Sequence, residues 1–81
     1  MTREAVFERV DAIFQDEFDD DSIHVNDATT SNDIEDWDSL EHINLICAIE
    51  EEFGMKFTMP EVTGMKCVGE MVDIILERAK D

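Results

Sequence analysis

Residues 37–54 read WDSLEHINLICAIEEEFG, and this stretch decides the fold because it carries the signals of a complete helix. Asp38 can accept backbone N–H groups as the N-cap residue, and Glu41 stands three residues later, as in a capping box. Gly54 can adopt the left-handed conformation that commonly ends a helix. The stretch therefore predicts a helix over residues 39–53.

The apolar residues of this helix cover a wider arc than the stripe of an ordinary surface helix. At about 100° per residue, seven apolar side chains share that arc: Leu40, Ile43, Leu45, Ile46, Cys47, Ile49 and Phe53. The narrower opposite side carries Glu41, Asn44, Ala48, Glu51 and Glu52. We therefore expect a central helix that contacts several neighbours and keeps a narrow acidic face in water.

Three further segments complete an all-helical pattern. Apolar residues at helical spacing predict helices over 2–15 and 67–80, with Thr2 as the N-cap of the first. Pro60 favours the first turn of a short helix that ends at Gly64. The prediction is an all-α fold, a small four-helix bundle with three longer helices and one short one, formed as a single domain by all 81 residues.

A long loop, residues 16–37, joins the first two predicted helices. It is rich in acidic residues and in the turn formers Asn, Asp, Ser and Thr. A loop of this length is unusual in a compact domain unless it is functional or pinned to the core. The apolar residues that we expect to pin it are Ile23, Val25, Ile34 and Trp37.

The charge of the chain is strongly and unevenly negative. There are 22 Asp and Glu against 6 Lys and Arg, a net charge of −16, and between Val10 and Met55 there are fifteen acidic residues and no Lys or Arg. Such a field repels nucleic acid and anionic lipid and attracts basic protein surfaces. We therefore expect no nucleic-acid binding, partner proteins with basic patches, and a monomer kept apart by self-repulsion.

The cysteines and histidines form no metal-binding pattern. Cys47 and Cys67 lack C-x-x-C spacing, and the two histidines add no ligand set. We expect no metal, and two small buried hydrophobes in a reducing cytoplasm. The N-terminal residues lack the apolar core of a signal peptide, and no apolar run approaches the roughly 20 residues of a membrane span. These features predict a cytoplasmic protein without a membrane span.

The tripeptide Asp38-Ser39-Leu40 is the part of the sequence that could carry chemistry. It puts the Ser39 hydroxyl in the first turn of the central helix, where unpaired N–H groups and the helix dipole favour a phosphate. Leu40, Ile43 and Cys47 continue down the adjacent face, where a tethered apolar chain could lie. The tripeptide alone is common, and it leaves open that Ser39 is only the first residue of a capped helix.

The longer context of this serine resembles a known family. Residues 37–54 are similar to the signature region of acyl carrier proteins, in which D-S-L precedes an amphipathic run that ends in E-E-E-F-G. Residues 66–72, KCVGEMV, look like the start of the last helix in that family. The acidity, the length and the long first loop also fit, so the resemblance covers essentially the whole chain.

The resemblance implies a carrier that is not itself an enzyme. Ser39 would receive 4′-phosphopantetheine from coenzyme A through a Mg²⁺-dependent phosphopantetheinyl transferase, and the thiol of that arm would hold an acyl group as a thioester. Asp38 and Leu40 match the neighbours of the family's serine, and Asp38 would help the transferase to recognise it. Partner enzymes of fatty-acid, polyketide or related acyl-transfer pathways would meet Glu41, Asn44, Glu50 and Glu51. The candidates for an acyl pocket are Ile43, Ile46 and Cys47.

Two positions depart from the pattern of housekeeping fatty-acid carriers. Asn44 stands where many such carriers have an acidic residue, and Trp37 stands where a small residue is common. These departures favour a dedicated pathway, such as polyketide, lipopolysaccharide or other specialised acyl transfer. The site also differs from the G-G-x-S-L pattern of peptidyl carriers, which disfavours an aminoacyl cargo.

Three alternatives remain on the residues alone. Ser39 and His42, at i and i+3, could form a nucleophile and its base, but no G-x-S-x-G elbow or glycine-made oxyanion hole accompanies them. Asp19 and Asp21 invite comparison with an EF-hand, yet the glycine and the spacing of that loop are absent. An acidic protein-interaction module without a prosthetic group would explain the charge but gives the D-S-L tripeptide no role.

Overall fold

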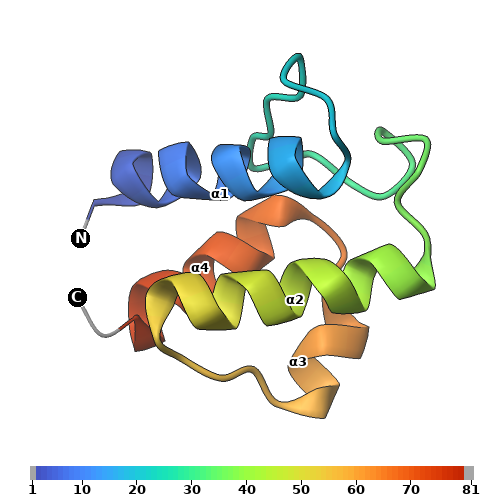
Figure 1. Ribbon diagram of the computed structural model, residues 1–81. Coiled ribbons are helices and arrows are strands. Elements are labelled where there is room, and N and C mark those ends of the chain that lie inside the picture. Colours follow the sequence, from blue (N-terminus) through green and yellow to red (C-terminus); the bar gives the residue numbers. More distant parts are fainter. Residues whose placement is uncertain (1, 80–81) are drawn as a thin grey trace.

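The computed structural model describes residues 2–79, and these form four α-helices. The helices are α1 (Arg3–Glu17), α2 (Ser39–Phe53), α3 (Met59–Gly64) and α4 (Val68–Arg78). α1 packs against both α2 and α4, and the shorter α3 lies beside the first half of α2 (Figure 1). The predicted four-helix bundle, with one short helix and a long loop between the first two, is therefore confirmed.

The helix boundaries agree closely with the sequence pattern. α2 spans the predicted residues 39–53, whereas α1 continues two residues beyond the predicted 2–15. α3 ends at Gly64, as predicted, and it carries Pro60 in its first turn. α4 ends at Arg78, and the last residue of the predicted helix over 67–80 lies outside the described residues.

Polar caps fix both ends of α2. The Asp38 carboxylate accepts the backbone N–H of Glu41 at 2.8 Å, and Gly54 ends the helix in the left-handed conformation, with φ 62° and ψ 42°. These two predictions are confirmed. The capping box also predicts a hydrogen bond from the Asp38 N–H to the Glu41 side chain. That prediction is wrong, because the Asp38 N–H donates to the Asp36 carbonyl at 3.1 Å. The Glu41 carboxylate instead accepts the side-chain amide of Asn44 at 3.2 Å.

The buried arc of α2 is narrower than the sequence predicted. Its buried side chains join α1 and α4 in one core, and they are Leu45, Ile46, Ile49 and Phe53. Leu40 and Ile43 are instead 69% and 46% exposed, and Cys47 is exposed. The outer side of α2 stays open because only the six-residue α3 lies near it. The expectation of two buried cysteines is therefore wrong for Cys47, and Cys67 is only half-buried.

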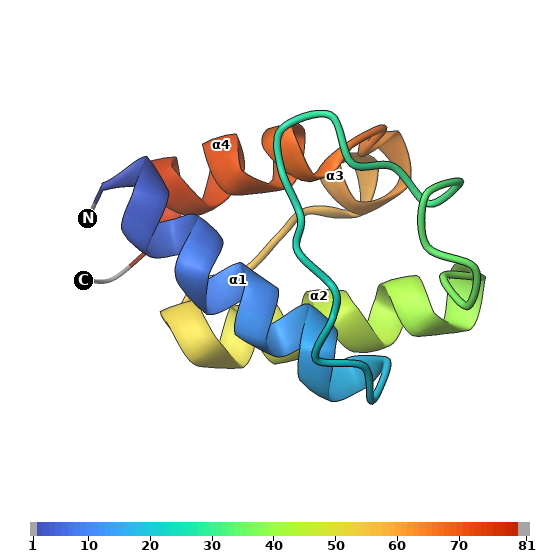
Figure 2. The ribbon, with the colours of Figure 1, turned by 90° about the horizontal axis from the view of Figure 1, so that it is seen from above.

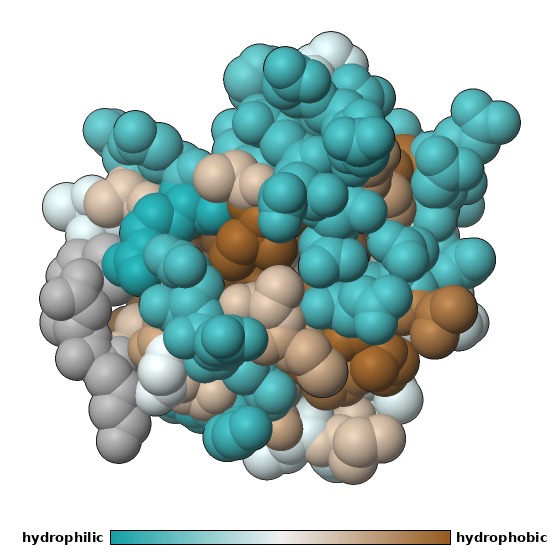
Figure 3. Space-filling view, viewed as in Figure 1, coloured by the Kyte–Doolittle hydropathy of each residue, from teal (hydrophilic) through white to brown (hydrophobic). Residues whose placement is uncertain are grey.

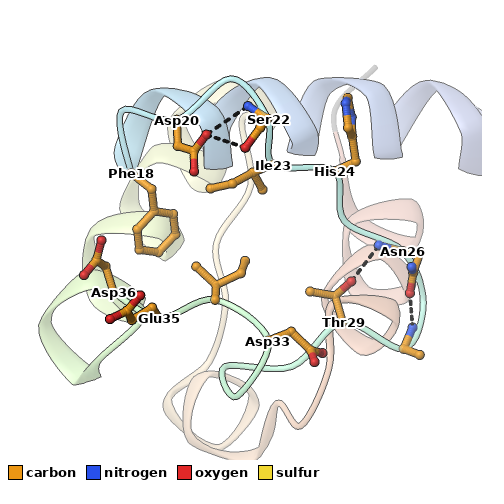
Figure 4. A pocket seen from close by; sticks show the side chains of 12 residues that line it. Phe18, Asp20, Ser22, Ile23, His24, Asn26, Thr29, Asp33, Glu35 and Asp36 are labelled. Atoms are coloured by element: carbon orange, nitrogen blue, oxygen red, sulfur yellow. Dashed lines mark hydrogen bonds between the residues drawn. The ribbon is translucent and has the colours of Figure 1, made fainter.

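The long loop is pinned by apolar side chains, as predicted. Val25 is buried in the core, and Ile23, Ile34 and Trp37 are half-buried against it. The loop and the end of α1 border an open hollow of about 630 Å³, in which Phe18 and Ile23 face inward while carboxylates stand around the rim (Figure 4). The loop thus has a small apolar centre of its own that continues into the bundle.

Backbone hydrogen bonds also attach the loop to the start of α4. The Val68 N–H donates to the Thr29 carbonyl at 2.8 Å, and the Gly69 N–H donates to the Asp27 carbonyl at 3.1 Å. Viewed from above, the loop passes over this end of α4 before it turns down to α2 (Figure 2). A Cβ atom at Gly69 would lie 2.7 Å from the Asp27 carbonyl oxygen, so the backbones touch only because residue 69 is glycine.

We predict that Gly69→Ala destabilises the fold by about 1–2 kcal/mol, since the steric cost of a forced backbone shift outweighs the gain in helix propensity. Gly64→Ala is the matched control, because a Cβ there meets nothing within 4 Å. Urea unfolding of both variants checks the prediction. Equal stability of the two variants would contradict the close contact between the loop and α4.

An ion pair joins α3 to α4. Glu61 in the first turn of α3 accepts hydrogen bonds from the Arg78 guanidinium and, at 2.8 Å, from the backbone N–H of Thr58. The Arg78 hydrogen bonds, followed by that of Thr58, lower the pKa of the Glu61 carboxyl from 4.5 to about 2. Because the folded pKa lies below the unfolded one, this contribution to stability is complete above pH 4.5 and is lost as the pH falls toward 2.

We therefore predict that the stability difference between the wild type and Glu61→Gln shrinks as the pH falls from above 4.5 to about 2. The difference is the quantity to follow, because protonation of other carboxylates also relieves repulsion across the acidic surface. Thermal unfolding at a series of pH values measures it, with the exposed Glu8→Gln as the control. A difference that stays constant across this range would refute the role of the ion pair.

Candidate functional site

Ser39 is exposed at the tip of α2, where it is the first helical residue. The preceding Asp38 holds the first turn in place by binding the N–H of Glu41. The hydroxyl therefore stands at the positive end of a fifteen-residue helix, with its backbone fixed and its oxygen open to solvent. A phosphate ester at this position would be stabilised by the helix dipole and would project away from the bundle.

A groove of about 510 Å³ runs beside Ser39, between the start of α2 and the segment from α3 to α4. Its lining mixes polar and apolar residues and consists of Ser31, Trp37, Asp38, Ser39, His42, Ile43, Val62, Thr63, Met65, Lys66, Cys67 and Met71. On the face seen in Figure 3, hydrophilic residues cover the loop, whereas a hydrophobic patch lies beside the start of α2 and α3. Ser39 therefore has apolar side chains of the groove on one side.

His42 connects two walls of the groove. The indole N–H of Trp37 donates to His42 Nδ1 at 3.2 Å, and His42 Nε2 lies 3.0 Å from the backbone carbonyl of Val62 in α3. Because an indole N–H can only donate, Nδ1 accepts, and the neutral imidazole carries its proton on Nε2 toward Val62. Both nitrogens are thus engaged away from Ser39. The arrangement provides no base for a serine nucleophile, which removes the geometric support for the enzymatic alternative.

The structure brings only part of the predicted site together. Asp38, Ser39 and Ile43 line the groove, and Leu40 projects into solvent beside it. Of the other two pocket candidates, Ile46 is buried in the core and Cys47 lies on the outer surface, so neither lines the groove.

Several lining residues were not predicted from the sequence. Cys67, Val62, Met65 and Met71 reach the groove from the α3 and α4 side. No local motif marks them, because the groove forms only when the chain folds back after α3. The sequence marked Trp37 as a departure from the common family pattern, but it did not predict the hydrogen bond between Trp37 and His42.

The predicted partner-binding residues of α2 divide into two groups. Asn44 and Glu51 are exposed, and Glu41 is half-exposed on the same side of the helix. The Glu50 side chain is only 16% exposed and accepts the backbone N–H of Phe57 at 2.8 Å, with Lys56 Nζ at 3.8 Å. Glu50 therefore holds the connection between α2 and α3 and is not free to meet a partner.

Among residues 2–79, no group of three or more His, Cys, Asp or Glu is arranged to hold a metal ion. In the same part of the chain, no helix is both long and apolar enough to cross a membrane.

Known proteins resemble this chain over nearly its whole length, although no protein-family model matches it. The acyl carrier protein of Petrotoga mobilis is 35% identical over 79 residues, which cover 96% of this chain and 92% of that protein. The acyl carrier protein of Streptococcus thermophilus is 36% identical and covers 94% of this chain and 99% of its own. The chain belongs to the acyl carrier protein family.

The fold of a solved acyl carrier protein agrees with this assignment. The solution structure of the holo acyl carrier protein from Geobacter metallireducens superposes with a TM-score of 0.85 at 38% identity. The match covers 90% of this chain and 84% of the Geobacter chain. This protein is therefore an acyl carrier and not an enzyme.

Proposed function

We propose that this acyl carrier bears 4′-phosphopantetheine on Ser39 and presents acyl groups on it to partner enzymes. The observation that carries the proposal is the exposed Ser39 at the N-terminus of α2, beside a groove that is partly lined by apolar side chains. When bound, the group supplies a terminal thiol that can hold an acyl chain as a thioester. The residues present fit it, because the helix end favours its phosphate and the groove offers apolar contacts.

The neighbours of Ser39 have separate roles in this proposal. Asp38 fixes the first turn through its hydrogen bond to Glu41, so the hydroxyl is presented to a phosphopantetheinyl transferase in one geometry. Leu40 is 69% exposed and offers that enzyme an apolar contact directly beside the serine. Asp38 thus mainly positions the Ser39 hydroxyl, and Leu40 mainly contributes to recognition by the transferase.

The partner enzymes would meet the outer side of α2, at Glu41, Asn44 and Glu51. Exposed charges of this kind speed association more than they tighten binding, which suits a carrier that must leave each enzyme after its turn. Asn44, in the middle of this surface, is uncharged, whereas many housekeeping fatty-acid carriers have an acidic residue at this position. We infer that the partners belong to a specialised acyl-transfer pathway in the cytoplasm, and that the carrier serves it as a monomer.

The test of this function is transfer of the arm to the purified protein. The protein is incubated with coenzyme A, Mg²⁺ and a broad-specificity phosphopantetheinyl transferase, and its intact mass is recorded. We expect a gain of a single phosphopantetheine per chain. If folded protein gains nothing with several transferases, Ser39 is not an attachment site, and this proposal fails.

A further inference from the structure

The indole of Trp37 lies between the groove and the hydrophobic core. Trp37 is half-buried, and its ring packs edge-on against Phe14 of α1, with centroids 5.1 Å apart and an interplanar angle of 80°. Phe14 is fully buried in the core. The indole therefore lines the groove beside Ser39, while an edge contact with Phe14 ties it to the core of the bundle.

His42 holds this indole in place from a second direction. The two rings stack with centroids 5.8 Å apart, and the indole N–H donates to His42 Nδ1. The opposite nitrogen of His42 is bonded to the Val62 carbonyl of α3. The position of the indole is thus coupled to the position of α3, which forms the other wall of the groove.

We propose that Trp37, positioned by His42, limits how far an acyl chain can enter the groove and so selects the chain length that the carrier protects. The inference rests on the proposed attachment of the cargo at Ser39. A chain that advances as far as the indole meets a ring packed on Phe14, and displacing it would break the hydrogen bond to His42. The N–H of a half-buried indole would then lack its partner, which makes further entry unfavourable.

The experiment loads Ser39 with acyl groups of increasing length, using the transferase and a series of acyl-coenzyme A molecules. Intact mass first establishes that each protein is loaded. The rate of thioester cleavage by hydroxylamine then reports protection, and the emission of Trp37, the only tryptophan in the sequence, reports contact with the chain. In the wild type we expect protection to grow by up to roughly fourfold per methylene that enters and then to reach a plateau. The emission should change at the length where the plateau begins.

Two pairs of variants test the roles of the two residues. Trp37→Leu should move the plateau to longer chains, whereas Phe18→Leu, which alters an aromatic ring outside the groove, should leave it unchanged. His42→Gln keeps one acceptor for the indole and one donor for Val62 and should preserve the wild-type plateau. His42→Leu removes both and should shift the plateau as Trp37→Leu does. Circular dichroism confirms that each variant is folded.

The results separate this inference from the function on which it rests. Loaded, folded Trp37→Leu with the wild-type plateau would overturn the role of the indole, and so would an equal shift in Phe18→Leu. If His42→Leu keeps the wild-type plateau, or if His42→Gln shifts it as far as His42→Leu does, the hydrogen bonds of His42 do not position the ring. Absence of loading in the wild type, seen directly by mass, would instead refute attachment at Ser39 and would remove the basis of the length limit.

Discussion

Replacing Ser39 with alanine is expected to abolish the gain of phosphopantetheine completely while leaving the fold intact. The side-chain oxygen is the only atom of residue 39 that could form the phosphate ester. Asp38 caps α2 through the backbone of Glu41, so the helix start does not depend on the serine hydroxyl. Alanine is a good helix former at this exposed position, and the free energy of unfolding should change by no more than about 0.5 kcal/mol.

Ser31→Ala is the matched control for this experiment, because Ser31 lines the same groove. It should gain one phosphopantetheine per chain, as the wild type does. Intact mass measures the loading, and thermal unfolding measures the stability of all three proteins. Undiminished loading of Ser39→Ala would place the arm elsewhere, and loss of loading in both variants would show that the effect is not specific to the Ser39 hydroxyl.

Phe14→Ala is expected to cost about 3–5 kcal/mol of stability, the largest effect of any single substitution that we predict. Phe14 is fully buried, and its ring contacts both Phe18, at a centroid distance of 6.0 Å, and Trp37. Its removal leaves a cavity at the junction of α1 and the long loop. A domain of this size has a stability of roughly 4–12 kcal/mol, so this loss removes about a quarter of the total or more.

Phe7→Ala is the control on the same helix, because Phe7 is only half-buried and its ring is covered by the Arg3 guanidinium at 5.5 Å. Its cost should be about 1–2 kcal/mol, since less apolar area leaves water. The midpoints of urea unfolding compare the two variants at equal ionic strength. Equal costs for the two substitutions would show that the core is not organised around Phe14.

The elements of this fold follow from signals that act over a few residues. Asp38 and Gly54 mark the two ends of α2 because a carboxylate cap and a left-handed glycine depend only on the adjacent turn. The serine that the structure leaves exposed at the tip of α2 follows from the same local pattern. These parts of the site were therefore predictable without any knowledge of how the helices pack.

The faces of the helices could not be predicted in the same way. Ile43 and Cys47 are apolar, yet Ile43 is 46% exposed and Cys47 lies on the surface, because α3, which lies beside the first half of α2, has only six residues. Glu50 resembles its acidic neighbours in sequence, but the N–H of Phe57 draws it into the connection between α2 and α3. Such outcomes depend on contacts between segments that are far apart along the chain or separated by a turn.

The groove beside Ser39 also depends on contacts between distant segments, so the sequence did not predict it. His42 lies between Trp37 and the Val62 carbonyl. This role can be recognised only once the arrangement of α3 beside α2 is known. A histidine three residues after a serine could equally have been a catalytic base. Only the hydrogen bonds of both its nitrogens identify it as a positioning residue.

The most direct test of the carrier function is the mass of the protein isolated from the cells that make it. Intact mass and fragmentation would locate any modification without added transferase. We expect one phosphopantetheine on the peptide that contains Ser39, with a fraction of the chains carrying a further acyl group that hydroxylamine releases. Protein that is folded but wholly unmodified, or that carries the group on another residue, would contradict the account.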